Sequence, residues 1–353
     1  MFYKYPISDV HIHAINASFA DQTLSMVDEL GYERFVMLSA ASMSPQFWSN
    51  NILCATIKLR SAGRGYAFAA ILYPETGAPE PDEMLAQAAL FHELGFDGIK
   101  MMDGKPNIRR RIGLPLNDPA YDPMFAFMEA ENIPLLYHVN DPDEFWTWDL
   151  MPQWAKAQGD LAFYGDGRYP PKQQIEDEAV EILDKHPSLR IIFPHFFFTS
   201  MSIERTRKLF ETYPNMSYDI TPGWEMFESF AANYDTWRDF FIKYSHRILF
   251  GTDTISDHWR ETVASLRRVM ETNEVFTAFE ENCRGLALDG EALQNIYRNN
   301  FNRYLPNPPR PMNTKLLRIY GQSLRKRIRS LPPELAEKAA ANLAEALGAL
   351  EGS

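Results

Sequence analysis

The sequence predicts an α/β fold, a closed (β/α)8 (TIM) barrel followed by a C-terminal helical extension. Eight short apolar segments alternate with longer amphipathic segments over most of the 353 residues. Repeated alternation of strand and helix is typical of a parallel sheet. The chain also lacks the glycine-rich motif of dinucleotide-binding folds, so eight units favour a closed barrel over an open sheet.

The predicted strands occupy residues 7–13, 34–40, 66–72, 96–102, 133–139, 189–196, 216–220 and 247–253. The helical stretches between them include 82–94, 123–131, 174–185, 203–212 and 225–244. In the first strand, His11 and His13 are expected on one face because successive side chains of a strand point to opposite faces. Val10 and Ile12 are expected on the other face.

Two segments exceed a minimal barrel. The connection 139–174 after the fifth strand is long and aromatic, and long connections in compact domains are usually functional. We therefore expect it to cover the barrel mouth. We divide the chain into a metal-dependent barrel domain, 1–310, and a helical extension, 311–353, with a helix over 332–350. The extension is expected to pack on the barrel or on a second subunit, so a homodimer or higher homo-oligomer is predicted.

Composition limits the classes of partner and compartment. The net charge is −12, which argues against nucleic-acid partners because these select basic surfaces. Cys54 and Cys283 are the only cysteines and form no CxxC pair, which fits a reducing compartment. The N-terminus lacks the apolar stretch of a signal peptide, and no apolar run approaches the ~18 residues of a membrane span. We expect a cytoplasmic protein without membrane partners.

Residues with metal-binding chemistry occur at the ends of four predicted strands. The carboxyl ends of barrel strands meet at one mouth, so these residues are expected to lie together. Their nitrogen and oxygen donors suit a divalent transition metal. They are His11 and His13 on the first strand, His138 on the fifth, His195 on the sixth and Asp253 on the eighth. His92, His186 and His246 are interpreted as structural or surface residues.

Five further residues are predicted to bind substrate. Lys100 ends the fourth strand, where its ammonium could bind a substrate carboxylate, its neutral amine could become carbamylated and bridge two metals, or the side chain could reach solvent. We favour carboxylate binding. The others follow the fifth and eighth strands, near the mouth; they are Trp146, Trp148, Arg168 and His258.

The motifs DVHIH, GFDGIKMM, LLYHVND, IIFPHF and RILFGTDT, with NIYRNNFNRYL, occur in this order over roughly residues 7–305. This set resembles the amidohydrolase superfamily, and more narrowly the amidohydrolase-related family that includes aminocarboxymuconate semialdehyde decarboxylase. The resemblance implies that His11, His13, His138 and Asp253 hold one divalent metal ion, with zinc expected first and manganese as the alternative. It also implies that Asp253 and His195 act in catalysis.

The implied activity is hydrolysis of a small, acidic amide, lactone or ester by a metal-activated water. The alternative is non-oxidative decarboxylation of an aromatic or muconate-type acid, and the sequence does not separate the two. Other metallohydrolases open with His-x-His, but their expected Glu on the fourth strand and a basic mouth are absent from this sequence. A non-catalytic metal-binding protein is the remaining alternative.

Overall fold

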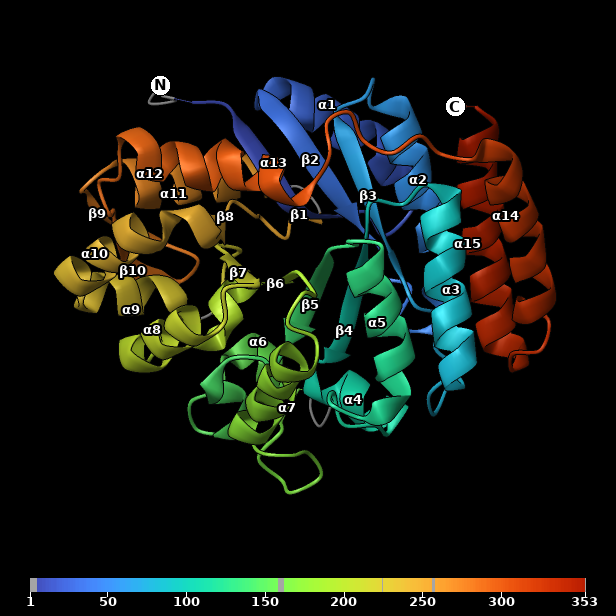
Figure 1. Cartoon of the computed structure of the whole chain (residues 1–353), viewed down its shortest axis with the longest axis horizontal. Coiled ribbons are helices and arrows are strands. Elements are labelled where there is room, and N and C mark those ends of the chain that lie inside the picture. Colours follow the sequence, from blue (N-terminus) through green and yellow to red (C-terminus); the bar gives the residue numbers. More distant parts are fainter. Residues whose placement is uncertain (1–4, 158–161, 224, 256–257, 353) are drawn as a thin grey trace.

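The computed structural model describes residues 5–157, 162–223, 225–255 and 258–352. Eight parallel strands pair in chain order, and helices surround them (Figure 1). The predicted (β/α)8 barrel is therefore confirmed. The strands are β1 (Ile7–His13), β2 (Tyr32–Leu38), β3 (Gly65–Ala70), β4 (Gly98–Gly104), β5 (Leu135–Val139), β6 (Ile191–Phe193), β7 (Met216–Asp219) and β8 (Ile248–Leu249).

The segment after β8 closes the barrel against β1. The amide N of Val10 donates to Phe250 O at 3.0 Å, and the amide N of His13 donates to Thr254 O at 3.0 Å. Between them, the amide N of Asp253 donates to His11 O at 2.8 Å. These bonds fix the backbone of Asp253 beside that of the two histidines of β1.

The helices of the barrel match most of the predicted stretches. The predicted helix 225–244 is wrong in one respect, because the chain leaves helical geometry at Asn233 and forms two helices. The helices are α1 (Ser18–Glu29), α2 (Asn50–Arg60), α3 (Pro81–Leu94), α4 (Pro106–Ile112), α5 (Asp122–Ala130), α6 (Gln153–Lys156), α7 (Lys172–Lys185), α8 (Ile203–Thr212), α9 (Met226–Ala232), α10 (Tyr234–Tyr244), α11 (Trp259–Glu271), α12 (Gly290–Gln294) and α13 (Asn300–Tyr304).

The core has an inner and an outer layer. Val36 and Leu38 of β2 belong to a small cluster built from several strands, whereas the intervening Met37 packs with the surrounding helices. The inner cluster includes Phe301 of α13, whose ring centroid lies 5.1 Å from that of Tyr66. The inner cluster thus fills the amino-terminal part of the barrel, and α13 covers that end. The opposite end is left for polar side chains.

A bulge in β1 changes the predicted orientation of one residue. Between the pairs Asp9–Phe35 and Ile12–Met37, β1 advances three residues while β2 advances two. The extra residue interrupts the alternation of faces. Ile12 faces the outer layer as predicted, but Val10 lies in the inner cluster. The prediction that both face away from the histidines is therefore wrong for Val10.

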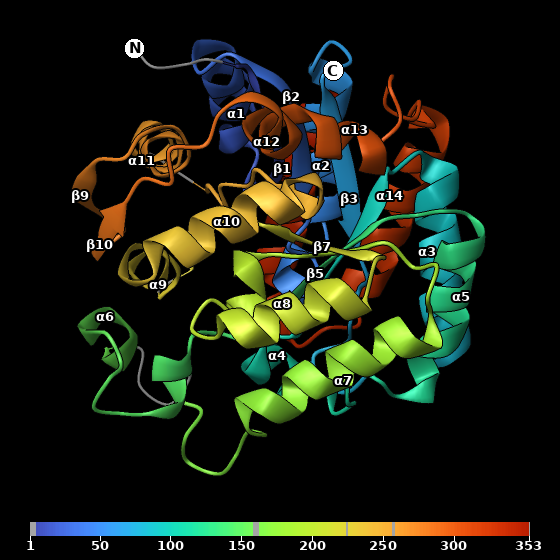
Figure 2. The same cartoon turned by 60° about the vertical axis from the view of Figure 1, so that its left-hand side comes forward.

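The C-terminal helices α14 (Thr314–Ile328) and α15 (Pro333–Glu351) lie beside α2 and α3 (Figures 1 and 2). Asn51 of α2 donates to the Tyr320 hydroxyl at 3.1 Å, and Asn342 of α15 donates to Gln46 O at 2.9 Å. The predicted helical extension is confirmed. Its separation from the barrel at residue 310 as a distinct domain remains an interpretation.

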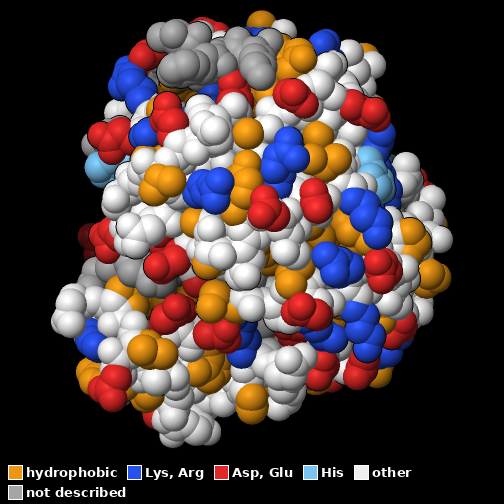
Figure 3. Space-filling model, turned by 90° about the vertical axis from the view of Figure 1, so that its left-hand side faces the viewer, with side chains coloured by type: hydrophobic (Ala, Val, Ile, Leu, Met, Phe, Trp, Pro, Cys, Tyr) orange, Lys and Arg blue, Asp and Glu red, His pale blue; other side chains and the backbone are white. Residues whose placement is uncertain are grey.

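A two-stranded hairpin, β9 (Val275–Ala278) and β10 (Glu281–Arg284), follows α11 and has no counterpart in the predicted elements. Its turn residues Phe279 and Glu280 both have positive φ, and the ring of Phe279 stacks on Phe227 of α9 at 4.9 Å. On the face shown in Figure 3, acidic and basic side chains are interspersed with apolar ones. Among the described helices, none has the length and apolar character needed to cross a membrane.

Candidate metal centre and active site

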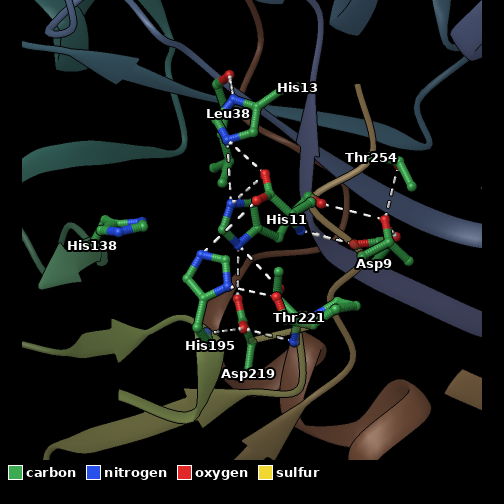
Figure 4. Close-up of polar contacts among 12 residues, drawn as sticks. Asp9, His11, His13, Leu38, His138, His195, Asp219, Thr221 and Thr254 are labelled. Carbon is green, nitrogen blue, oxygen red and sulfur yellow. Dashed lines mark hydrogen bonds and ion pairs between the residues drawn. The ribbon is translucent and has the colours of Figure 1, made fainter. Parts of the chain in front are cut away.

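Two histidines and one aspartate form a compact group at the carboxyl end of the barrel, and Figure 4 shows the two histidines. The Nε2 atoms of His11 and His13 lie 3.2 Å apart. Asp253 Oδ1 lies 3.4 Å from each of them. The structure thus brings together three of the four predicted metal ligands, from β1 and from the segment after β8.

The outer nitrogens of the rings are held by hydrogen bonds that fix their tautomers. His11 Nδ1 donates to Asp219 Oδ2 at 2.9 Å, and His13 Nδ1 donates to Leu38 O at 2.9 Å. His195 Nδ1 donates to Pro222 O at 3.1 Å. A neutral ring that donates through Nδ1 has a lone pair on Nε2. In their neutral forms all three Nε2 atoms are therefore acceptors or ligands, which is the arrangement found around protein-bound metals.

Asp219, at the end of β7, links two of these histidines. Besides His11 Nδ1, it accepts the amide N–H groups of His195 and Thr221, each at 3.0 Å. Asp219 is buried, and the sequence reasoning did not assign it to the site. Its position at a strand end was the available signal, but one aspartate on a short strand is a weak pattern.

The pKa values of the three residues in the group are shifted in different directions. Burial opposes protonation of His11, but Asp253 and Asp219 outweigh it and raise the His11 pKa above its usual value. Burial lowers the pKa of His13 to about 3. Burial also favours the neutral form of Asp253, yet His11 and His13 hold its pKa well below the usual range. The group therefore contains an ionised carboxylate and at least one neutral imidazole at neutral pH.

His195 lies beyond the end of β6, in a left-handed turn. His195, Phe196, Phe197 and Phe198 have φ of 55°, 54°, 58° and 50°, a conformation that favours glycine. Phe196 stacks on Phe241 at 5.5 Å, and all four residues are buried. Packing therefore holds the turn. His195 Nε2 lies 3.9 Å from Asp253 Oδ2 and has no hydrogen-bond partner among the described residues.

His138 lies near the group but apart from it (Figure 4). Its Nε2 donates to Asn140 O at 2.9 Å and lies 3.7 Å from Asp141 Oδ1. Its ring is 4.9 Å from the ring of His195. The structure does not place His138 in the three-residue group, so its role as a ligand stays a prediction. In this arrangement His195, and not His138, directs its Nε2 lone pair toward Asp253.

The donor set fits a divalent cation. Two imidazole nitrogens with lone pairs 3.2 Å apart repel each other unless a proton or a cation lies between them. Asp253 supplies the negative charge, and the unpartnered His195 Nε2 supplies another donor facing it. Three imidazoles and a carboxylate are ligands typical of zinc and of other transition metals.

A cavity of about 300 Å³ opens beside this group. Aromatic side chains form part of its wall: Phe145 and Tyr164 from the long connection after β5, and Phe198 from the left-handed turn. Phe198 stacks on His195 with ring centroids 5.0 Å apart. The remaining lining residues are Lys105, Asn107, His138, Asp141, Pro142, Ala162, His195, Pro222, Gly223 and Asp253.

Lys100 lies deeper in the barrel than the sequence suggested. It pairs with Leu136 in the β4–β5 ladder, and its side chain is fully buried. Its Nζ has no hydrogen-bond partner among the described residues, and burial lowers its pKa to about 8. Lys100 is not among the residues lining the cavity. Its direct contact with substrate therefore stays a prediction.

Comparison of the sequence with family profiles finds a match to the amidohydrolase family over residues 9–300. The chain belongs to the amidohydrolase family. This confirms the predicted membership, and with it the prediction of an enzyme of the amidohydrolase type. No curated protein sequence matched the chain.

Solved structures share the fold of this amidohydrolase at low sequence identity. A 2,6-dihydroxybenzoate decarboxylase in complex with 2,6-dihydroxybenzoate has a TM-score of 0.54 and 16% identity, covering 85% of this chain and 98% of that one. A dihydroxybenzoic acid decarboxylase from Polaromonas sp. JS666, with bound manganese and an inhibitor, has a TM-score of 0.51, 15% identity and coverages of 85% and 96%. An amidohydrolase from Burkholderia multivorans with bound zinc has a TM-score of 0.50, 10% identity and coverages of 85% and 99%.

The other predicted substrate-binding residues of this amidohydrolase do not line the cavity. Trp146 donates through its indole N–H to Pro170 O at 3.1 Å, and Trp148 is 47% exposed beside Phe163. Arg168 pairs with Asp166. His258 is exposed and lines a neighbouring hollow that also touches Asp253. Substrate contact by these four residues stays a prediction, as does coverage of the mouth by the two tryptophans.

Sequence reasoning missed several residues that do line the cavity. Lys105 and Asn107 follow β4 directly, and Asp141 follows β5 within the motif HVND. The signal that could have found them is a polar residue just after a barrel strand. Phe198 was not predicted because a run of three phenylalanines is typical of a buried core.

Proposed function

We propose that this amidohydrolase hydrolyses a small amide, lactone or ester that carries a carboxylate. The position of Asp253 is the observation that carries the proposal. Its Oδ1 faces the two histidines of β1, its Oδ2 faces His195, and its side chain lines the cavity. One carboxylate therefore adjoins both the donor group for a metal and the space for a substrate.

His11, His13 and Asp253 would hold a divalent ion, with His195 Nε2 as a further donor. When bound, such an ion polarises a substrate carbonyl and activates a water molecule. Asp219 and Leu38 O orient the two rings of β1, and this preorganisation keeps their Nε2 atoms directed at the same point. Manganese and zinc occur in related structures, and zinc is proposed here because imidazole ligands dominate.

Asp253 is the proposed proton carrier. As an ionised carboxylate it accepts a proton from the attacking water and returns it to the leaving group, which is general acid–base catalysis. The Nδ1 of His195 donates to Pro222 O, so its Nε2 is an acceptor, and we assign His195 to orienting the water or to ligation.

Decarboxylation of an aromatic acid is the second candidate. Two structurally similar proteins are dihydroxybenzoate decarboxylases, and one of them holds its substrate. The aromatic wall of Phe145, Tyr164 and Phe198 would also suit a flat acid. Hydrolysis is placed first because Asp253 and the histidines suffice for it.

Isotopic labelling separates the two reactions. A panel of lactones, amides and hydroxybenzoic acids is offered to the metal-loaded protein, and any substrate that turns over is repeated in labelled solvent. Hydrolysis places ¹⁸O from water in the product. Carbon dioxide release with deuterium from D2O on carbon, and no turnover of lactones or amides, would contradict hydrolysis.

Two further proposals concern the protein as a whole. We propose a homodimer or higher homo-oligomer, which size-exclusion chromatography with light scattering tests. We also propose a cytoplasmic location without nucleic-acid partners, supported by the net charge of −12 and by two buried cysteines that are both unpaired.

A further inference from the structure

The cavity beside the metal group contains a second set of polar residues: Lys105, Asn107 and Asp141. We propose that Lys105 binds a carboxylate of the substrate, and that this carboxylate is distinct from the group that reacts beside Asp253. The substrate class is then an acid with a second carbonyl or carboxyl group. This inference rests on the proposed function of the same site, and it names the residue that selects the substrate.

Lys105 is the one lysine or arginine among the described residues that line the cavity. Its Nζ donates to Asp141 Oδ1, and no other partner of that ammonium is found in the described part of the chain. An ammonium has three N–H donors, so two remain for a ligand. The side chain keeps 26% of its surface exposed, so the head group is accessible without rearrangement.

Asp141 positions the ammonium. The carboxylate is buried, and its Oδ2 accepts the Tyr164 hydroxyl at 2.7 Å while its Oδ1 accepts Lys105. Tyr164 is itself part of the aromatic wall. Asp141 therefore fixes both a cation and a ring at the same side of the cavity. Asn107 adds an amide whose buried Oδ1 lacks a partner in the described part of the chain, which leaves its side chain uncommitted.

Other cations of this region are less suited to the task. Lys100 is fully buried and does not line the cavity. Lys172 Nζ lies 3.0 Å from Asp143 Oδ1, and Arg168 pairs with Asp166. A carboxylate of the substrate reaches Lys105 within the cavity, whereas Lys100, Lys172 and Arg168 are not among the residues that line it. The role predicted for Lys100 is therefore assigned to the lysine five residues later, where β4 has ended.

Calorimetric titration tests the inference without turnover. The probes are terephthalate and isophthalate, which carry two carboxylates, and benzoate, which carries one; the protein is the zinc-loaded full chain. Wild-type protein is expected to bind at least one dicarboxylate about 10- to 100-fold more tightly than benzoate, because a charge-assisted contact contributes on this scale. Lys105→Met should abolish this advantage, and Lys105→Arg should restore part of it.

Asp141→Asn distinguishes a ligand-binding lysine from a structural ion pair. It keeps the cation and an amide oxygen that can still accept from Lys105, but it removes the competing negative charge, so the affinity for the dicarboxylate should be unchanged or higher. A purely structural pair predicts that Lys105→Met and Asp141→Asn lower this affinity equally, which would overturn the proposal. Because Lys105→Met leaves Asp141 buried without its cation, the double variant Lys105→Met/Asp141→Asn provides a folded comparison. It should also lack the advantage.

Lys156→Met is the matched control, since Lys156 lies in the same long connection but outside the cavity, over the ring of Trp148. It should bind all three probes as wild type does. Wild-type protein that binds neither dicarboxylate more tightly than benzoate would also overturn the proposal. If binding follows Lys105 but no amide, lactone or ester is hydrolysed, the proposed reaction fails and the assignment of Lys105 remains.

Discussion

Asp219 fixes the ring of His11, whose Nδ1 lies 2.9 Å from Asp219 Oδ2 inside the barrel. The same carboxylate accepts the backbone N–H of His195 through Oδ1. One buried side chain of β7 therefore orients a donor from β1 and the start of the left-handed turn after β6. Groups of this kind, which touch the ligands and not the metal, set how well the ligands converge.

Asp219→Asn is predicted to weaken zinc affinity by about 10- to 100-fold, because the neutral amide is a poorer acceptor for His11 Nδ1. Competition with a fluorescent chelator measures the affinity, and circular dichroism verifies the fold. Asp235→Asn changes an exposed aspartate of α10 and serves as the control. Equal zinc affinity in wild type and Asp219→Asn would show that Asp219 does not support the site.

Variants of Asp253 and His195 test which residue supports metal binding and which supports turnover. Asp253→Asn is predicted to lower zinc occupancy and to abolish turnover, since it removes the anionic donor and the proton carrier. His195→Asn should lower kcat by at least ~100-fold, the scale of a lost proton-transfer or orienting partner. Elemental analysis and steady-state kinetics measure both. His246→Asn, at the other end of β8, should match wild type; activity retained in His195→Asn would remove His195 from the mechanism.

The left-handed turn is predicted to depend on the packing of Phe196. Phe196→Ala should lower the free energy of unfolding by about 3–5 kcal/mol, because it removes a buried ring and weakens the restraint on a strained backbone. Urea denaturation measures the change. Phe163→Ala, on a partly exposed ring of the long connection, should cost less than half as much. Equal costs would mean that Phe196 packing does not hold the turn.

The buried Glu281 of the hairpin should make stability depend on pH. Burial raises its pKa from 4.5 to about 8, and its Oε1 has no described hydrogen-bond partner. Between these values the folded chain binds more protons than the unfolded chain, so the free energy of unfolding falls as pH rises. Glu281→Gln is predicted to raise stability at about pH 8.5, by on the order of 2 kcal/mol, with a smaller effect near pH 5.

Thermal unfolding at several pH values measures this effect. Glu280→Gln is the matched control, because Glu280 is the neighbouring residue, lies in the turn of the same hairpin and is exposed. Its effect should be small and similar at both pH values. A Glu281→Gln benefit that does not grow with pH would contradict the titration of this carboxyl group.

The barrel could be predicted from the sequence because short apolar segments, which alternate with amphipathic ones, indicate buried strands directly. It placed His11, His13 and Asp253 together because barrel strands share one mouth. It did not indicate the turn from His195 to Phe198, since left-handed backbone is normally signalled by glycine and this turn is held by tertiary packing. The sequence also did not indicate how deeply each side chain lies, because Lys100 and Lys105 are five positions apart in one segment but differ in access to the cavity.

Lys100→Met is predicted to stabilise the metal-free protein by about 1–3 kcal/mol. The ammonium is fully buried without a hydrogen-bond partner in the described part of the chain, and an apolar side chain of similar length removes that penalty. Lys58→Met provides a control that should change the stability in the opposite direction. Lys58 Nζ bonds Asp97 at 2.6 Å, so its loss leaves a buried carboxylate unpaired and should destabilise the protein. Urea denaturation that shows both variants less stable would contradict the first expectation.

The same variant tests how many metal ions the site holds. With Lys100 as a free amine, wild type and Lys100→Met should each bind one divalent ion per chain, because His11, His13 and Asp253 form one donor group. Elemental analysis after dialysis against zinc, with and without bicarbonate, measures the stoichiometry. Bicarbonate is included because the CO2 in equilibrium with it carbamylates a neutral lysine amine with release of a proton, and burial lowers the pKa of Lys100 to about 8. Two ions per chain in wild type with bicarbonate, and one in Lys100→Met, would show that Lys100 bridges two metals and does not remain a free amine.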